Sequence, residues 1–160
     1  MARRATSKKF GMELDAQLCF DLYAASRAVT NAYRPLLADL GLTYPQYLVM
    51  LVLWERGSCT VRELGDALQL DSGTLSPLLK RLMSAGLIRR ERRTDDERTV
   101  EAVLTDDGRA LRAKAEGVPS DIGAAMGLEP AEFAALKATL RRLVDNVSAS
   151  DLASTSQHPG

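Results

Sequence analysis

The residues of this chain that are best suited to chemistry are a cysteine and a group of tyrosines near the N-terminus. Cys19 and Tyr23 lie with Tyr33 in the stretch LDAQLCFDLYAASRAVTNAYRPLL, and Tyr44 follows shortly after it. A thiolate is a nucleophile that can be oxidised, and a phenol hydroxyl can stabilise it by donating a hydrogen bond. The group therefore suggests a redox-reactive thiol. The alternative is that Cys19 is a small buried hydrophobic residue and that the tyrosines pack at a helix interface.

The spacing of Cys19 and Tyr33 limits how they can meet. The apolar stripe of this stretch has helical periodicity and predicts one helix over about 14–40, ended by Gly41. Along such a helix Tyr33 points within roughly 40° of the Cys19 direction but lies about 21 Å further on. The two side chains share a face and cannot touch within one helix. Either they belong to separate parts of the core, or a second, antiparallel copy of the helix brings them together.

A second group of residues is suited to reading DNA. The segment DSGTLSPLLKRLMSAG predicts a helix that begins at Asp71 or Ser72 and ends at Gly86, although Pro77 also allows a start with Ser76 as N-cap. A helix in the major groove needs small polar residues near its N-terminus and basic residues that reach phosphates. A solvated polar helix face is the alternative. The candidate DNA contacts on this helix are Ser72, Thr74, Ser76, Lys80 and Arg81.

The segment that follows has the pattern of a charged hairpin. In RRERRTDDERTVEAVLT, alternating residues on both sides of a turn at 94–97 predict two antiparallel strands. An arginine at such a tip can enter the minor groove, and an acidic neighbour can fix its orientation. The alternative is a solvated hairpin with salt bridges. The candidate DNA contacts here are Arg92, Arg93 and Arg98, with Asp96 as the orienting carboxylate.

The elements that position these residues are mostly helical. Residues 43–105 contain a helix, a short helix capped by Thr60, the candidate DNA-reading helix and the hairpin, which together predict a winged helix-turn-helix. The fold class expected is mainly α with a small β-hairpin wing. Long amphipathic helices over 12–42 and 106–148 leave apolar stripes that this small unit cannot cover, and this predicts a homodimer. A basic arm, 1–11, and a polar tail, 149–160, are expected to be disordered.

Composition restricts the remaining possibilities. The chain has 160 residues, which suits one domain, and a formal net charge of zero, so a nucleic-acid signal must be local. Two cysteines and the lack of a signal peptide or long apolar run predict a protein of the reducing cytoplasm, away from membranes. The lone histidine, His158, lies in the polar tail, so no metal, cofactor or histidine-based catalysis is expected. Cys59 precedes a helix start, where the dipole can lower its pKa slightly, and a structural role is expected for it.

Several stretches resemble the MarR family of dimeric winged-helix regulators, namely LTYPQYLVMLVLWE, LDSGTLSPLLKRL and the wing pattern DDERTV followed by VLTDDG. The stretch LDAQLCFDLY is similar to the organic-hydroperoxide-sensing, OhrR-type branch, and the likeness spans 14–147. The resemblance implies an intertwined homodimer in which Cys19 is the peroxide-reactive thiol. Tyr33 and Tyr44 of the other subunit would hydrogen-bond to it, with Tyr23 nearby. It also implies a repressor that leaves a pseudo-palindromic operator in double-stranded DNA when an organic hydroperoxide oxidises Cys19.

The stretch AEGVPSDIGAAMGLEP lacks the second, resolving cysteine that some members of this branch carry. The sequence therefore resembles the one-cysteine type, in which a low-molecular-weight thiol caps the oxidised cysteine and peroxide-detoxification genes are derepressed. Two alternatives stay open. One is a MarR-type repressor released by a small aromatic ligand, with Cys19 structural; the other is a one-cysteine thiol peroxidase. The arginine-rich wing, and the lack of an Arg/Thr-Cys peroxidase motif around Cys19, predict that the chain is not an enzyme.

Overall fold

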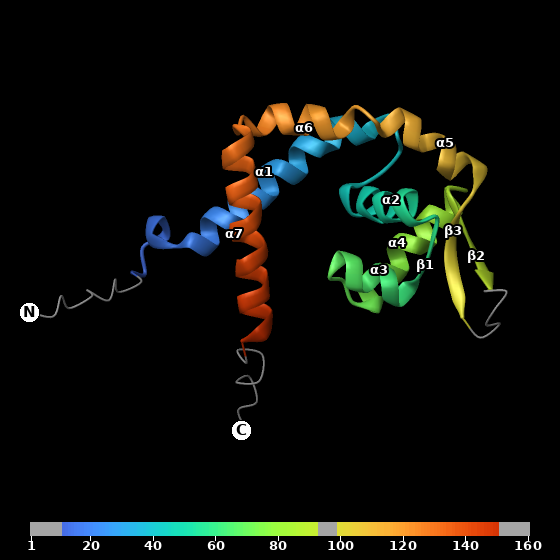
Figure 1. The fold of residues 1–160 in the computed structure, drawn as a ribbon, viewed down its shortest axis with the longest axis horizontal. Coiled ribbons are helices and arrows are strands. Elements are labelled where there is room, and N and C mark those ends of the chain that lie inside the picture. Colours follow the sequence, from blue (N-terminus) through green and yellow to red (C-terminus); the bar gives the residue numbers. More distant parts are fainter. Residues whose placement is uncertain (1–10, 93–98, 151–160) are drawn as a thin grey trace, which may run out of the picture. The chain divides into compact units, whose positions relative to one another are not determined.

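The computed structural model describes residues 11–92 and 99–150, and it is mostly helical with one small sheet (Figure 1). Contacts divide the chain into two units, Met1–Ile122 and Gly123–Gly160. In the described part of the first unit the elements are a 3-10 turn (Leu14–Ala16), α1 (Leu18–Ala38), α2 (Tyr44–Arg56), β1 (Ser58–Thr60), α3 (Val61–Leu68), α4 (Ser72–Ser84), β2 (Ile88–Arg92), β3 (Val100–Leu104), α5 (Asp106–Ala115) and most of α6 (Val118–Met126). Helix α7 (Pro130–Ala149) belongs to the second unit.

The winged helix-turn-helix is confirmed, and its helix ends follow from local sequence. The backbone N–H of Thr43 donates to the side chain of Gln46 at 2.8 Å, and α2 ends at Gly57, whose φ of 82° suits glycine. Thr60 opens α3 through a reciprocal capping box with Glu63, as the sequence predicts.

The turn between α3 and α4 is tight because of two backbone features. Gln69 adopts a left-handed conformation, with φ of 55°, directly after α3. Gly65 faces the carbonyl oxygen of Leu70, which would lie 2.7 Å from an added Cβ atom. Helix α4 then begins at the N-cap Asp71, whose carboxylate accepts the backbone N–H of Thr74 at 2.8 Å.

The start of α4 decides between the two predicted N-caps. Asp71 is the cap, so a start at Ser76 is wrong, and Pro77 lies inside the helix. The side-chain hydroxyl of Ser76 donates to the carbonyl oxygen of Ser72 at 2.7 Å. Gly86, with φ of 73°, ends the segment, and the N–H of Leu87 returns to the carbonyl of Leu82.

The sheet has one strand more than the predicted hairpin. Its order is β1-β3-β2, and both neighbouring pairs are antiparallel. In the β2–β3 hairpin Ile88 pairs with Leu104 and Arg90 pairs with Ala102, in agreement with the alternation of the sequence. Three-residue β1, which pairs Cys59 with Ala102, is too short to show a period of its own, so only the partner strand identifies it.

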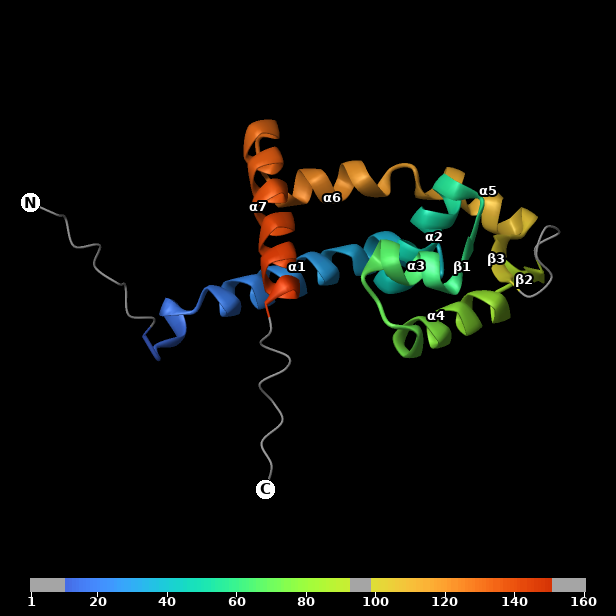
Figure 2. The same ribbon diagram turned by 60° about the horizontal axis from the view of Figure 1, so that its bottom comes forward.

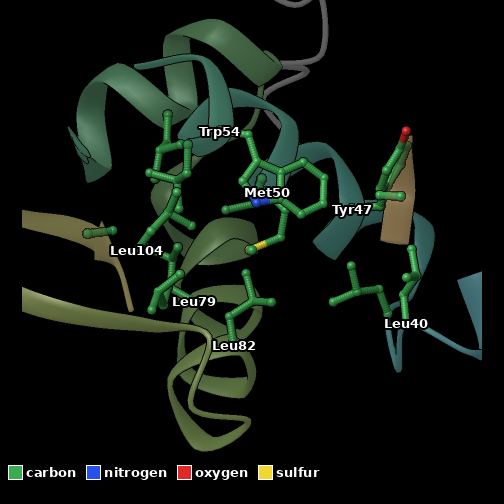
Figure 3. Packing of buried hydrophobic residues seen from close by; sticks show 14 of the residues in the cluster. Leu40, Tyr47, Met50, Trp54, Leu79, Leu82 and Leu104 are labelled. Carbon is green, nitrogen blue, oxygen red and sulfur yellow. The ribbon is translucent and has the colours of Figure 1, made fainter. Parts of the chain in front are cut away.

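The core fills the space between α2, α4 and the sheet (Figure 3). Met50 and Trp54 of α2 lie above Leu79 and Leu82 of α4, with Leu104 of β3 beside them. Fully burying a large aliphatic side chain stabilises a fold by about 1.5–3 kcal/mol, so this cluster fixes the orientation of α4 and the wing.

Helix α1 differs from the predicted single helix over 14–40. Gln17 has extended backbone angles, so a separate 3-10 turn precedes α1, and α1 ends at Ala38. Its C-terminal end packs on α2 through Leu37, whereas its N-terminal half extends away from the winged core (Figures 1 and 2). The exposed apolar side chains of this N-terminal region are Met12, Leu14, Leu18, Phe20 and Tyr23.

The helices after the wing begin and end close to the predicted positions. The N-cap of α5 is Thr105, which accepts the N–H of Gly108, so Asp106 and its neighbour Asp107 lie in the first turn rather than at the cap. Residues 116 and 117 separate α5 from α6. In the second unit, α7 carries no buried residue and ends at Ala149, the first residue of the predicted tail.

Candidate functional site

The predicted DNA-reading residues of α4 all lie on its exposed surface. Leu75, Leu79 and Leu82 are buried against the core, which turns the polar residues outward. The polar set Ser72, Thr74, Ser76, Lys80 and Arg81 is exposed throughout. The hydroxyl of Thr74 donates to Asp71 at 2.9 Å, so this residue also fixes the first turn of the helix.

The wing is described only in part. Arg92 is exposed at the end of β2, whereas Arg93, Asp96 and Arg98 lie outside the described residues. Two further arginines of β2 were not among the predicted contacts. Arg89 binds Glu91 and donates to the carbonyl oxygen of Leu104 at 3.2 Å. Arg90, one position on, is exposed on the other face of the strand.

Cys19 lies in the first turn of α1 and is exposed. Tyr23, one turn further on, is 59% exposed, and the guanidinium of Arg27 lies 5.5 Å from the centre of its ring. Cys19 is exposed in the single chain, so the alternative interpretation of a buried residue requires a second chain that covers it. It sits among apolar side chains that lack a covering surface, as expected of a region that contacts another molecule.

The other predicted tyrosines form a cluster where α1 meets α2. The ring centres of Tyr33 and Tyr44 are 4.4 Å apart, and those of Tyr33 and Tyr47 are 5.8 Å apart. Burial raises the pKa of all three phenols above the ordinary value of 10.0, and the charges of the other two add to the rise for Tyr33. At neutral pH these phenols are protonated, so each can donate a hydrogen bond.

Tyr47 is the member of the cluster that sequence reasoning missed. It is 2% exposed and also contacts Trp54, with 6.2 Å between ring centres. The available signal was its position three residues after Tyr44, which places both on neighbouring parts of one helix face.

The structure does not bring Cys19 and Tyr33 together within one chain. Both lie on α1, Cys19 in its first turn and Tyr33 near its end, so the distance along the helix stays near the predicted value of about 21 Å. A contact between them therefore requires a second chain.

The second cysteine is a core residue. Cys59 is 1% exposed, on β1, and burial raises the pKa of its thiol. The expectation that the helix dipole slightly lowers this pKa is wrong, because loss of hydration outweighs it; Arg56 opposes the rise only in part.

Two hydrogen bonds join α2 to α5, the helix that follows the wing. The indole N–H of Trp54 donates to the carbonyl oxygen of Gly108 at 2.8 Å, and Arg112 donates to the carbonyl of Trp54 at 3.4 Å. Between these helices lies a hollow of about 250 Å³. Its lining is mainly apolar, with Tyr47, Leu51, Trp54, Ala115 and Pro119, and its charged members are Arg112, Glu55 and Glu116.

Two searches for other kinds of site found nothing in the described residues. No cluster of three or more histidine, cysteine or acidic side chains in 11–92 and 99–150 could hold a metal ion. Over the same ranges, no helix has the length and apolar character that a membrane crossing requires.

The winged helix, with polar residues facing outward on α4 and basic residues on the wing strand, defines a protein of the DNA-binding regulator class. Comparison with known proteins agrees, because the family described as "Transcriptional regulator SarA/Rot" matches residues 31–114. The chain belongs to this family of MarR-like winged-helix regulators.

Individual relatives are transcriptional regulators too. The chain is 49% identical to the HTH-type transcriptional regulator TtmR of Methylorubrum extorquens, over 90% of this chain and 74% of that protein. It is 46% identical to the organic hydroperoxide resistance transcriptional regulator of Bacillus subtilis, over 85% of this chain and 92% of the relative. These proteins are regulators rather than enzymes, which confirms the expectation that this chain is not an enzyme.

Solved structures support the same assignment. Reduced AbfR of Staphylococcus epidermidis bound to DNA is 36% identical, with a TM-score of 0.72, over 84% of this chain and 92% of that one. BpsR of Bordetella bronchiseptica, whose DNA binding is regulated by 6-hydroxynicotinic acid, is 28% identical, with a TM-score of 0.74, over 88% and 99% of the two chains. This chain is a transcriptional regulator of the MarR/OhrR type.

Proposed function

We propose that this regulator is a homodimeric repressor that senses organic hydroperoxides through Cys19 and then releases its DNA operator. The observation that carries the proposal is the separation of an exposed thiol in the first turn of α1 from a cluster of protonated phenols where the far end of α1 meets α2. An antiparallel α1 of a second chain would place the Cys19 of each subunit against the Tyr33 and Tyr44 of the other. The similarity to the organic hydroperoxide resistance regulator of Bacillus subtilis supports the response to hydroperoxides.

The dimer would also cover the apolar surfaces left by the single chain. The N-terminal part of α1 exposes Leu18 and Phe20, at 58% and 40%. Helix α7, in the second unit, exposes Phe133, Leu136 and Leu140 along one stripe. Patches of this kind on a small protein mark interaction surfaces, and helices at both ends of the chain provide them here.

The proposed chemistry starts from the Cys19 thiolate. It attacks the outer oxygen of the hydroperoxide; the new S–O bond forms as the O–O bond breaks, and the leaving alkoxide takes up a proton to become an alcohol. Sulfur loses two electrons and the peroxide gains them, leaving a sulfenic acid. A low-molecular-weight thiol then forms a mixed disulfide with Cys19 and releases water.

Oxidation would weaken DNA binding through the tyrosines. The neutral phenols of Tyr33 and Tyr44 donate well to a thiolate but poorly to a bulky mixed disulfide, so the preferred arrangement of the two subunits changes. The two α4 helices of a dimer must match half-sites of a pseudo-palindromic operator, and a modest change in their spacing breaks this match. A shift of 1.4 kcal/mol changes the affinity about tenfold.

Cys19→Ser tests the sensing step. We expect the variant to bind its own upstream DNA and to stay bound when an organic hydroperoxide and a small thiol are added, because it lacks the oxidisable sulfur. Fluorescence anisotropy measures the bound fraction, and the wild type should release DNA at a near-stoichiometric dose of oxidant.

Cys59→Ala is the matched control, because its thiol is buried and should not react. It should release DNA as the wild type does. Prompt release of Cys19→Ser by peroxide would refute the assignment of Cys19, and a wild type that binds no DNA would refute the repressor itself.

The apolar hollow between α2 and α5 favours a second candidate function. The hollow has a volume of about 250 Å³ and the rings of Tyr47 and Trp54 lie on its wall, so it fits a small planar aromatic compound. Its charged lining residues are Arg112, Glu55 and Glu116. BpsR is regulated by a compound of this class. In that case 6-hydroxynicotinic acid or a related acid would release DNA equally from the wild type and from Cys19→Ser.

A further inference from the structure

The groove between α4 and β2 has a composition that suggests a specific role. It is an open hollow of about 650 Å³, lined by Gly73, Ser76, Pro77, Lys80, Met83 and Arg90. Two of these residues are cations and none is acidic, although the full chain has as many acidic as basic side chains. A site that excludes carboxylates and collects cations is suited to an anion.

The lining residues come from two elements that the core fixes relative to each other. Positions 73, 76, 77 and 80 lie on one face of α4, opposite the buried Leu75 and Leu79. Arg90 lies on the same face of β2 as Ile88, which is 3% exposed in the core. Arg90 therefore stands where the hydrophobic core ends and the groove begins.

The two cationic side chains of the groove are also available to bind an anion. Among the residues that the structure describes, neither Lys80 nor Arg90 takes part in an ion pair, whereas the neighbouring Arg89 is bound to Glu91 and to the carbonyl of Leu104. Small residues at Gly73 and Ser76 leave room for a chain of atoms to approach the backbone of α4.

We propose that this groove holds the sugar-phosphate backbone of one DNA strand, and that Arg90 contacts a phosphate there together with Lys80. The inference rests on the proposed DNA-binding function. If α4 enters the major groove and the wing enters the adjacent minor groove, the strand that separates the two grooves must pass between α4 and β2. Arg90 was not among the contacts predicted for base or minor-groove recognition; its role is affinity independent of sequence.

Salt dependence tests this role, because each phosphate contact contributes about 0.9 to the slope of log affinity against log salt. Arg90→Gln should make this slope shallower by about 1.8, one contact from each subunit of a dimer. Its affinity should fall by the same factor on the upstream DNA and on an unrelated duplex, so that the ratio of the two is unchanged. Arg90→Lys should restore most of the slope.

Arg89→Gln is the matched control: it removes the same charge one position away, from the opposite face of β2, and should change the slope much less. Thermal unfolding of each variant, followed by circular dichroism, verifies that the fold is retained. An unchanged slope for a folded Arg90→Gln would overturn the inference. A loss confined to the upstream DNA would also overturn it, since it would mean that Arg90 reads a base. A wild type that binds neither duplex would instead refute the proposed function.

Discussion

At the scale of single residues, the chemistry of this regulator depends on the surroundings of a few side chains. The two cysteines illustrate this, because Cys19 is exposed and Cys59 is 1% exposed. A thiol buried in an apolar core stays protonated, whereas a solvent-accessible thiol can react with an oxidant. The same sequence thus contains one candidate sensor and one structural cysteine, and their different burial distinguishes the two roles.

The tyrosine cluster gives a prediction about pH. Burial raises the pKa of Tyr33, Tyr44 and Tyr47, so the folded state favours their protonated forms. The stability that they contribute should be fully present below pH 10, the ordinary pKa of tyrosine, and should be lost as pH rises through the higher pKa values of the folded state. Absorbance at 295 nm during alkaline titration measures the phenolates, and the folded chain should titrate at higher pH than the chain in denaturant. Coincident titration curves would contradict the burial of the cluster.

At the scale of elements, the backbone is closely packed at the junction of the wing with α5. Gly108 is buried, and a Cβ atom added to it would lie 2.0 Å from the carbonyl oxygen of Leu87. Its own carbonyl accepts the indole N–H of Trp54. This junction joins α2, α5 and the hairpin, so it determines how the wing is attached.

Gly108→Ala should destabilise the fold by about 3 kcal/mol, because α5 must move away from the hairpin to admit the methyl group. Denaturant unfolding measures the free-energy difference. Gly123→Ala is the control: this glycine is also helical, but an added Cβ meets nothing within 4 Å. It should stabilise the chain by about 0.5–1 kcal/mol through helix propensity. Equal effects of the two substitutions would mean that the junction is not tightly packed.

At the scale of the whole molecule, apolar side chains of both terminal helices are exposed among the described residues. Every side chain of α7 from Ala131 to Arg142 is exposed, including Phe133, Leu136 and Leu140. In proteins, amphipathic helices gain most of their stability from burying such a stripe against another surface. The proposed dimer supplies the missing surface and creates the contact between Cys19 and the tyrosines.

Phe133→Asp should shift the protein from dimer to monomer, because it places a charge within the stripe that the partner would cover. Light scattering coupled to size-exclusion chromatography measures the mass. Ala138→Asp, on the opposite side of α7, introduces the same charge and should leave the dimer intact. A Phe133→Asp variant with unchanged mass would show that α7 does not form the interface.

Much of the fold could be predicted from local sequence. Caps such as Thr43 and Thr60, and glycine ends such as Gly57 and Gly86, are encoded within a few residues, because the groups that end a helix are neighbours in the chain. The alternation around the wing likewise predicted the two antiparallel strands of the hairpin. The break at Gln17 and the choice of Asp71 over Ser76 as N-cap were less certain, since several local solutions compete there.

The sequence by itself determined the chemical types available, namely a thiol, phenols and a basic hairpin, and the helices and strands that carry them. Only the tertiary structure decided which of them meet. It paired β1 with β3, buried Cys59, brought Tyr47 into the tyrosine cluster, and set Arg90 across a groove from Lys80. The physical reason is that periodicity and capping act over one or two helical turns. Burial and the meeting of distant side chains depend instead on how whole elements pack.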